Sequence, residues 1–216
     1  LKRRNMRKNV VLKVLFVACL FGISCLLSQC CCKSGCETEM DKSQVVYENI
    51  MTRKSVRAYD PNKPIEKDVV EKLLKAAMAA PTAVNKQPWE FVVVDDKEII
   101  AEYAKTQKGR VQVANAGILV VSCGNMEKAL EGEAQEYWVQ DASAACENML
   151  LAAHAFGLGA VWTGVYPIQK RVEDVSNFFK LPETIIPLCV VPVGYPAEDP
   201  APKDKWVPEK VHWNKW

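Results

Sequence analysis

The sequence lacks the glycine-rich signatures that bind nucleotide phosphates in the commonest folds. Neither a Gly-x-Gly-x-x-Gly segment nor a Walker loop occurs among its 216 residues, which argues against a Rossmann or P-loop nucleotide site. Histidine is also scarce: only His154 and His212 are present, and neither lies beside a Gly-x-Ser-x-Gly motif. A Ser-His-Asp hydrolase therefore has few candidate residues. No internal repeat is visible, so a solenoid or a propeller is not indicated.

Cysteine is rare in most of the chain. Six of the nine cysteines lie in the first 36 residues, and the other three are Cys123, Cys146 and Cys189. Those three sit in apolar runs, which predicts buried free thiols rather than a disulfide framework. The cluster from Cys30 to Cys36 has no histidine near it, so a zinc site is not expected and no metal is predicted.

Acidic residues are missing from residues 1–36, which hold seven of the 28 basic residues. The rest of the chain has more acidic than basic residues, so nothing favours binding to nucleic acid. A basic start followed by the apolar stretch from Val10 to Leu27 is typical of a secretory signal. We therefore expect a targeting segment at residues 1–36, a polar tether at 37–44 and a folded domain at 45–216.

The cysteines after the apolar stretch resemble those of a bacterial lipoprotein signal, in which one cysteine is lipidated and becomes the first mature residue. Cys25 and Cys30 both fit that pattern imperfectly. This favours an exported or membrane-anchored bacterial protein, attached to the membrane through its N-terminal segment. The alternatives are an uncleaved anchor or a cytoplasmic protein whose start is misassigned, since residue 1 is leucine and Met6 could begin the chain.

Hydrophobic periodicity predicts alternating helices and strands in residues 45–216. Helices are expected at 45–51, 65–80, 96–106, 137–156 and 169–179, and strands at 91–94, 118–123, 160–163 and 185–193. The strand at 118–123 is apolar on both faces and should be central. Pro187 and Pro192 favour an edge position for part of the last strand. Asp95 or Asp96 should cap the third helix. This order of elements is compatible with an α+β or an α/β fold.

Two segments carry candidate binding residues. Residues 81–88, called the amide loop from here on, lie between two prolines and present Asn85 and Gln87. Amides offer donors and acceptors together, which suits the edge of a flavin or a base; the alternative is a polar loop that bonds its own backbone. Residues 53–57, the basic segment, hold three cations and one serine. They could bind a phosphate through guanidinium forks, or they could form a solvent-exposed turn.

His154 and the glycines near residue 160 are weaker candidates. His154 is expected to be a core or partly exposed histidine rather than a catalytic one. Gly157 and Gly159 follow the long helix and should end it. Gly164, after a short strand, would permit a ligand to approach the backbone closely.

Three motifs together resemble the nitroreductase family. Pro81-Thr-Ala-Val-Asn-Lys-Gln-Pro-Trp89 is similar to the family loop Pro-Ser-x-x-Asn-x-Gln-Pro-Trp. Arg53-Lys-Ser-Val-Arg57 is similar to its Arg-x-Ser-x-Arg element, and Gly157-Leu-Gly-Ala-Val-Trp-Thr-Gly164 to its Gly-x-Gly-x-x-Trp segment. The motifs occur in family order, and the resemblance covers about residues 45–216.

The resemblance implies an α+β fold: a central, mostly antiparallel sheet flanked by helices, in a domain-swapped homodimer with two FMN sites at the interface. It implies an oxidoreductase that moves electrons from NADH or NADPH through flavin N5 to a nitroaromatic, a quinone or a similar small acceptor. No catalytic side chain is expected, because the flavin supplies the chemistry. The alternatives are a membrane-anchored flavin-binding module without turnover and an interaction protein without flavin.

The resemblance also implies a set of cofactor-binding residues. They are Arg53, Lys54, Ser55, Arg57, Pro81, Thr82, Asn85, Gln87, Gly164, Val165 and Lys205. The basic segment would bind the ribityl phosphate, with Arg57 near the pyrimidine edge of the flavin, and the backbone at Gly164 and Val165 would face N5. Thr82 would serve the partner's flavin. From the tail, residues 195–216, a basic residue would return to the phosphate; Lys205 fits best and Lys203 second, although the family often has arginine there.

Overall fold

A five-stranded sheet organises the fold in the computed structural model, which describes residues 41–107 and 111–216. The expected targeting segment at 1–36 and the first part of the expected tether lie outside the described residues. The strands are β1 (Trp89–Val94), β2 (Ile118–Asn125), β3 (Gly159–Ala160), β4 (Thr163–Gly164) and β5 (Ile185–Gly194). All pairings between these strands are antiparallel, in the order β1-β2-β5-β3 with β4 also on β5. The predicted α+β fold with an antiparallel sheet is confirmed.

The predicted helices are all present, with small differences at their ends. They are α2 (Lys42–Thr52), α3 (Lys67–Met78), α4 (Lys97–Thr106), α5 (Tyr137–Ala155) and α6 (Gln169–Phe179), with short 3-10 turns at Ala83–Asn85, Val111–Val113, Gly132–Glu136 and Pro208–Lys210. Asp96 caps α4 by accepting hydrogen bonds from the N–H groups of Glu98 and Ile99. The first helix begins at Lys42, inside the expected tether, since Asp41 accepts a hydrogen bond from the Ser43 N–H at 3.0 Å and so satisfies a donor at its start.

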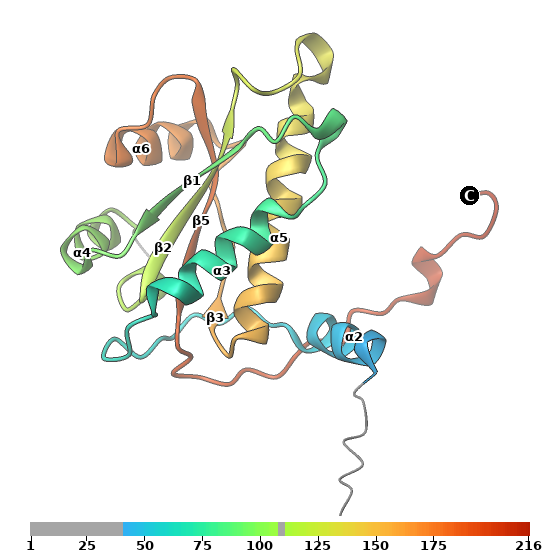
Figure 1. Cartoon of the computed structure of the whole chain (residues 1–216), viewed down its shortest axis with the longest axis horizontal. Helices are drawn as coiled ribbons and strands as arrows, with labels where there is room; N and C mark the ends of the chain where they lie inside the picture. Colours follow the sequence, from blue (N-terminus) through green and yellow to red (C-terminus); the bar gives the residue numbers. More distant parts are fainter. Residues whose placement is uncertain (1–40, 108–110) are drawn as a thin grey trace, which may run out of the picture. The chain divides into compact units, whose positions relative to one another are not determined.

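Two helical layers cover the two faces of the sheet. Residues Val45–Trp216 form one compact unit, to which all five strands belong. Within it, α3 and α5 cover one face, while α4 and α6 cover the other (Figure 1). Successive side chains of a strand point to opposite faces, so Val120 packs in the α3/α5 core and Val121 in the α4/α6 core. Every residue of β2 is buried, which confirms the predicted central strand.

The expectation of an edge position for part of the last strand is confirmed at residues 185–187, which pair with β2 and with no other strand of the described residues. Pro192, by contrast, lies in the part of β5 that runs inside the sheet, with β2 on one side and β3 and β4 on the other. Its prolines are accommodated at irregularities of the ladder. Pro187 lies opposite Cys123, where the register between β2 and β5 shifts. Pro192 lies between the residues paired with β4 and those paired with β3. A proline that lacks the N–H can therefore stand in an interior strand where no donor is required.

The strand expected at 160–163 is broken into β3 and β4. Val161 and Trp162 separate the two pieces, and Val161 donates only one bond back to β5, to the Pro192 carbonyl at 3.4 Å. Pro192 has no N–H to return, so the ladder is interrupted at this point. The break places Gly159 and Gly164 on two separate short strands.

The described part of the chain offers no sign of a membrane span or of a metal centre. None of the helices within residues 41–107 and 111–216 is both long enough and apolar enough to cross a bilayer. No group of three or more potential ligands for a metal ion occurs in the same residues. Cys123, Cys146 and Cys189 are buried and free, as predicted.

Candidate functional site

A basic cleft of about 400 Å³ forms where the basic segment meets the start of the tail. The residues that line this cleft are Arg53, Lys54, Ser55, Arg57, Pro200, Ala201, Lys203 and Lys205. Five of these eight are cations, and they come from two segments far apart in the sequence. The structure therefore brings both Lys203 and Lys205 to the Arg-x-Ser-x-Arg element, where the family resemblance implied one basic residue from the tail. Clustered cations in a concave site favour a ligand with a phosphate or another dianion.

Backbone hydrogen bonds hold the basic segment against β3 and the start of the tail. Val56 donates its N–H to the Ala160 carbonyl at 3.1 Å, and Ser55 pairs with Ala160 as an isolated bridge. Tyr59 is buried, and its hydroxyl donates to the Val56 carbonyl at 2.7 Å. On the other side, Ala197 donates to the Ala58 carbonyl at 2.9 Å. The cations of the basic segment thus project from a backbone that is fixed at both edges.

Two tail carboxylates, Glu198 and Asp199, bond to residues that line the cleft. Glu198 accepts hydrogen bonds from the N–H groups of Arg57 at 2.7 Å and Ala58 at 3.2 Å. Asp199 forms an ion pair with Lys54, whose hydrogen bond holds the pKa of Asp199 below its usual value. A bound anion would compete with Asp199 for Lys54 or share its ammonium group, which has three donors. The signal in the sequence was the pair of acids between Pro196 and Pro200.

His154 lies beside the cleft and does not line it. Its Nε2 is 3.0 Å from the Thr52 hydroxyl. Partial burial, followed by the nearby charges of Lys54 and Arg53, lowers the pKa of His154. All three effects favour the neutral imidazole. The half-buried position agrees with the predicted partly exposed histidine.

The amide loop is closed by its own threonine and anchored by α5. Thr82 Oγ1 accepts a hydrogen bond from the Gln87 N–H at 3.1 Å across the loop. The Ala83 N–H donates to Asp141 Oδ1 at 2.9 Å. Asn85 and Gln87 are exposed, and their side-chain amides meet each other at 3.3 Å. The side chain that bonds to the loop backbone is therefore Thr82 and not Asn85 or Gln87, and both amide side chains remain exposed.

Backbone strain is concentrated in this loop. Val84, Asn85 and Gln87 have positive φ angles of 50°, 55° and 51°. Residues with a Cβ rarely adopt this left-handed region, and a β-branched valine does so least readily. Strain of this kind is found where surrounding contacts impose it, often at binding sites.

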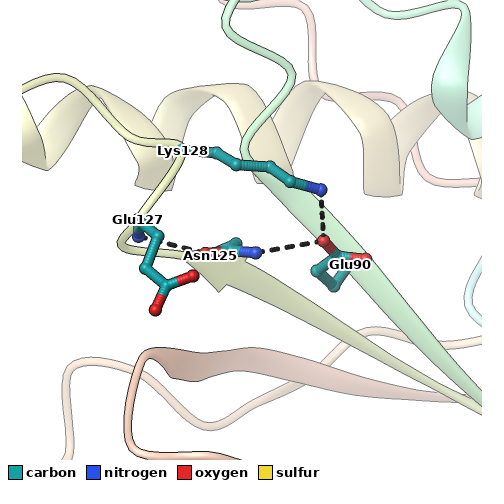
Figure 2. Close-up of polar contacts among 4 residues, drawn as sticks. All are labelled: Glu90, Asn125, Glu127 and Lys128. Atoms are coloured by element: carbon teal, nitrogen blue, oxygen red, sulfur yellow. Dashed lines mark hydrogen bonds and ion pairs between the residues drawn. The ribbon is translucent and has the colours of Figure 1, made fainter.

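A polar network fixes the point where the amide loop enters the sheet. Asn125, at the end of β2, donates its backbone N–H to the Pro88 carbonyl at 2.6 Å. Its side chain donates to Glu90 Oε1 at 3.1 Å and accepts from the Glu127 N–H at 3.0 Å, while Lys128 donates to the same Glu90 oxygen at 2.6 Å (Figure 2). The hydrogen bonds from Lys128 and Asn125 lower the pKa of Glu90. The network spans β1 and β2, and it was not apparent from the sequence.

Gly164 and Val165 differ in the space around them. A Cβ added at Gly164 would meet nothing within 4 Å, so packing within the chain does not require glycine there. The Val165 side chain is buried, and its N–H donates to the Leu188 carbonyl at 3.0 Å. That bond already uses the Val165 donor. Space for a close approach of a ligand is therefore present beside the Cα of Gly164.

The amide loop and the basic cleft lie at opposite ends of α5. Figure 1 shows the loop beside the start of this helix and β3, which holds the basic segment, near its end. Asp141 anchors the loop, whereas Asn49, just before the basic segment, bonds to the Leu151 carbonyl. These two positions are about 15 Å apart along a helix that rises 1.5 Å per residue. One chain therefore does not bring the two groups of predicted residues together.

Comparison with known proteins agrees with the arrangement of these elements. A protein from Methanothermobacter thermautotrophicus, named as an NADH dehydrogenase/NAD(P)H nitroreductase, is 42% identical over 79% of this chain and 87% of its own length. The crystal structure of a similarly named protein from Parabacteroides distasonis matches with 40% identity and a TM-score of 0.74, over 80% of this chain and 99% of that one. An FMN-dependent nitroreductase from Clostridium difficile matches with 29% identity and a TM-score of 0.71, over 79% of this chain and 99% of that one.

A family model extends this similarity to most of the folded unit. It is described as the nitroreductase family and matches residues 50–195. The match contains the basic segment, the amide loop and the Gly157–Gly164 segment, and it ends where the tail begins. The chain therefore belongs to the nitroreductase family.

Proposed function

We propose that this protein is an FMN-dependent oxidoreductase that passes electrons from NADH or NADPH to a nitroaromatic, a quinone or a similar small acceptor. The observation that carries the proposal is the basic cleft, where five cations and Ser55 from two distant segments converge. Bound FMN would supply the redox chemistry by accepting a hydride from the nicotinamide and passing electrons to the acceptor. The names of the relatives support this activity.

The residues of the cleft fit a ribityl phosphate. Arg53 and Lys54 carry positive charge, Ser55 offers a hydroxyl donor, and Lys205 approaches from the tail. Arg53 is already oriented by Glu147, whose Oε1 lies 3.3 Å from its Nε. An orienting carboxylate of this kind leaves the other guanidinium donors available for an anion. The role of Arg57 is to place positive charge near the pyrimidine edge of the flavin, where negative charge develops on reduction.

A homodimer completes the site in this proposal. The amide loop of one protomer would then reach the cofactor held by the basic cleft of its partner, because one chain keeps them at opposite ends of α5. Large apolar side chains are exposed on α2 and on the tail: Val46, Tyr47, Ile50, Met51, Trp206, Trp213 and Trp216. Exposed apolar side chains gathered in this way are typical of an interface.

The substitution Ile50→Asp should weaken this dimer. Ile50 is 51% exposed on α2, and a carboxylate there would lose its hydration if the helix is covered. We expect dimer dissociation to become easier by roughly tenfold or more, measured by sedimentation velocity over a concentration series. Ile99→Asp is the matched control, since Ile99 is 41% exposed on α4. An Ile50→Asp protein that dissociates no more readily than the Ile99→Asp protein would contradict the interface.

The absorbance spectrum of the purified protein tests the activity itself. We expect a flavin spectrum that bleaches when NADH or NADPH is added without oxygen and recovers when a quinone or nitroaromatic is added. A flavin spectrum that does not bleach would instead favour a flavin-binding module that does not turn over. No flavin, even after reconstitution with FMN, would refute the proposed function.

A further inference from the structure

We propose that Asp141 is a positioning residue, which holds the amide loop in the shape that binds the cofactor. The inference rests on the proposed function and assigns to Asp141 a task that the three sequence motifs do not include. Asp141 lies in α5, distant in sequence from the loop, and its side chain contacts the loop backbone at Ala83.

Burial and charge make the Asp141 contact unusual. Asp141 is only 6% exposed, and it is the one charged residue among the buried residues of the described chain. Burying a carboxylate is unfavourable unless hydrogen bonds compensate for the lost hydration. Its Oδ1 accepts the Ala83 N–H at 2.9 Å, and bonds to an ionised acceptor are stronger than bonds between neutral groups. The buried charge is thus directed at the start of the amide loop.

The amide loop needs an external restraint because its own residues disfavour its conformation. Val84, Asn85 and Gln87 all have positive φ angles, and the Val84 side chain is 81% exposed, so little packing within the chain compensates. Two backbone bonds form the 3-10 turn of the loop, from Asn85 N–H to the Thr82 carbonyl and from Lys86 N–H to the Ala83 carbonyl. Three further bonds hold it: Gln87 N–H to Thr82 Oγ1, Asn125 N–H to the Pro88 carbonyl, and Ala83 N–H to Asp141. Of these, only the Asp141 bond comes from a side chain outside the loop.

A weaker restraint should reduce the fraction of molecules whose loop is ready to bind. The apparent Kd rises in inverse proportion to that fraction. Loss of one hydrogen bond to a carboxylate should therefore weaken FMN binding by about tenfold. Turnover at saturating FMN should stay within about twofold, since the bound state still selects the competent loop.

Two variants at this position separate the hydrogen bond from the charge. Asp141→Ala removes the acceptor, whereas Asp141→Asn keeps an oxygen that can accept the Ala83 N–H. We expect FMN titrations to give a Kd raised about tenfold for Asp141→Ala and within about threefold of wild type for Asp141→Asn. In the FMN-free protein, NMR-detected exchange of the Ala83 amide should be at least about tenfold faster in Asp141→Ala.

Asn148→Ala is the matched control. Asn148 also lies on α5, but its side chain donates to the Ala76 carbonyl of α3 at 3.2 Å and does not contact the amide loop. This variant should lower the melting temperature without changing the Kd for FMN or the exchange of the Ala83 amide. A Kd that rises equally in Asn148→Ala and Asp141→Ala would show a general loss of stability and overturn the inference.

The outcomes distinguish this inference from the proposed function. If the wild-type protein binds FMN and Asp141→Ala binds it equally well, only the positioning role is refuted. If Asp141→Ala fails to fold, the test rests on Asp141→Asn. A wild-type Kd for FMN and wild-type exchange of the Ala83 amide in Asp141→Asn would support the role of the acceptor oxygen. A Kd raised tenfold or more in Asp141→Asn would count against that role. If the wild-type protein does not bind FMN at all, the proposed function itself is refuted.

Discussion

Reversing the charge of Arg57 should reduce kcat/KM by at least about 100-fold, which is the scale of loss when a group that stabilises developing charge is removed. Arg57 lines the basic cleft and is exposed, so Arg57→Glu removes no core contact. The backbone N–H of this residue, which donates to Glu198, stays in place. A glutamate would place negative charge where reduction of the cofactor creates more of it, and both the electron transfer and the affinity for FMN should suffer.

Steady-state kinetics with NADH and a quinone acceptor measure this effect in protein that retains its flavin, as judged from its absorbance. Arg57→Lys keeps the charge and loses the planar fork, so we expect a smaller decrease, roughly tenfold or less. Lys67→Glu makes the same charge reversal at an exposed residue of α3 outside the cleft and should leave turnover unchanged. Wild-type turnover in an Arg57→Glu protein that still holds flavin would refute the role of this charge.

Local sequence patterns predicted most of the fold because the relevant physics is local. The apolar spacing of α3, the β-branched run of β2 and the capping aspartate of α4 each depend on residues within one element. The interior position of the second half of β5 was missed for the opposite reason. Its two prolines are tolerated because of a register shift against β2 and a gap between β3 and β4, and neither can be read from β5 itself.

In the candidate site, too, some residues could be predicted from the sequence and others could not. The resemblance to the nitroreductase family implied that Arg53, Lys54, Ser55, Arg57 and Lys205 lie together, and the structure gathers them in one cleft. It did not indicate Asp141, Glu198 or Asn125, whose partners are the Ala83, Arg57 and Pro88 backbone groups. A single carboxylate or amide carries no periodic signal, and its partner depends on how distant segments pack. Residues that hold the predicted cofactor-binding residues in place can therefore be identified only from the structure.

The second large effect is expected from Gly159, where a methyl group has no room. A Cβ at this position would lie 2.6 Å from Val56 Cγ1 and 2.7 Å from Val56 Cβ. Rotation of the Val56 side chain cannot relieve the second contact, because Cβ moves only with the backbone. Gly159→Ala must therefore displace the basic segment, whose Ser55 and Arg57 flank Val56. Overpacking of this kind should destabilise the protein by about 3 kcal/mol, and FMN binding should weaken by more than the loss of stability alone explains.

Thermal unfolding and FMN titration together test this prediction. In the double variant Gly159→Ala/Val56→Gly the clashing atoms are gone, so the affinity for FMN should recover relative to Gly159→Ala even though the Val56 packing is lost. Gly164→Ala is the control for stability, since its Cβ would meet nothing within 4 Å and the melting temperature should not change. A Gly159→Ala protein with wild-type stability and wild-type affinity would mean that the basic segment can move without consequence. The contacts of Val56 with β3 would then not set the geometry of the cleft, and the position of its cations would have to be fixed from the tail side.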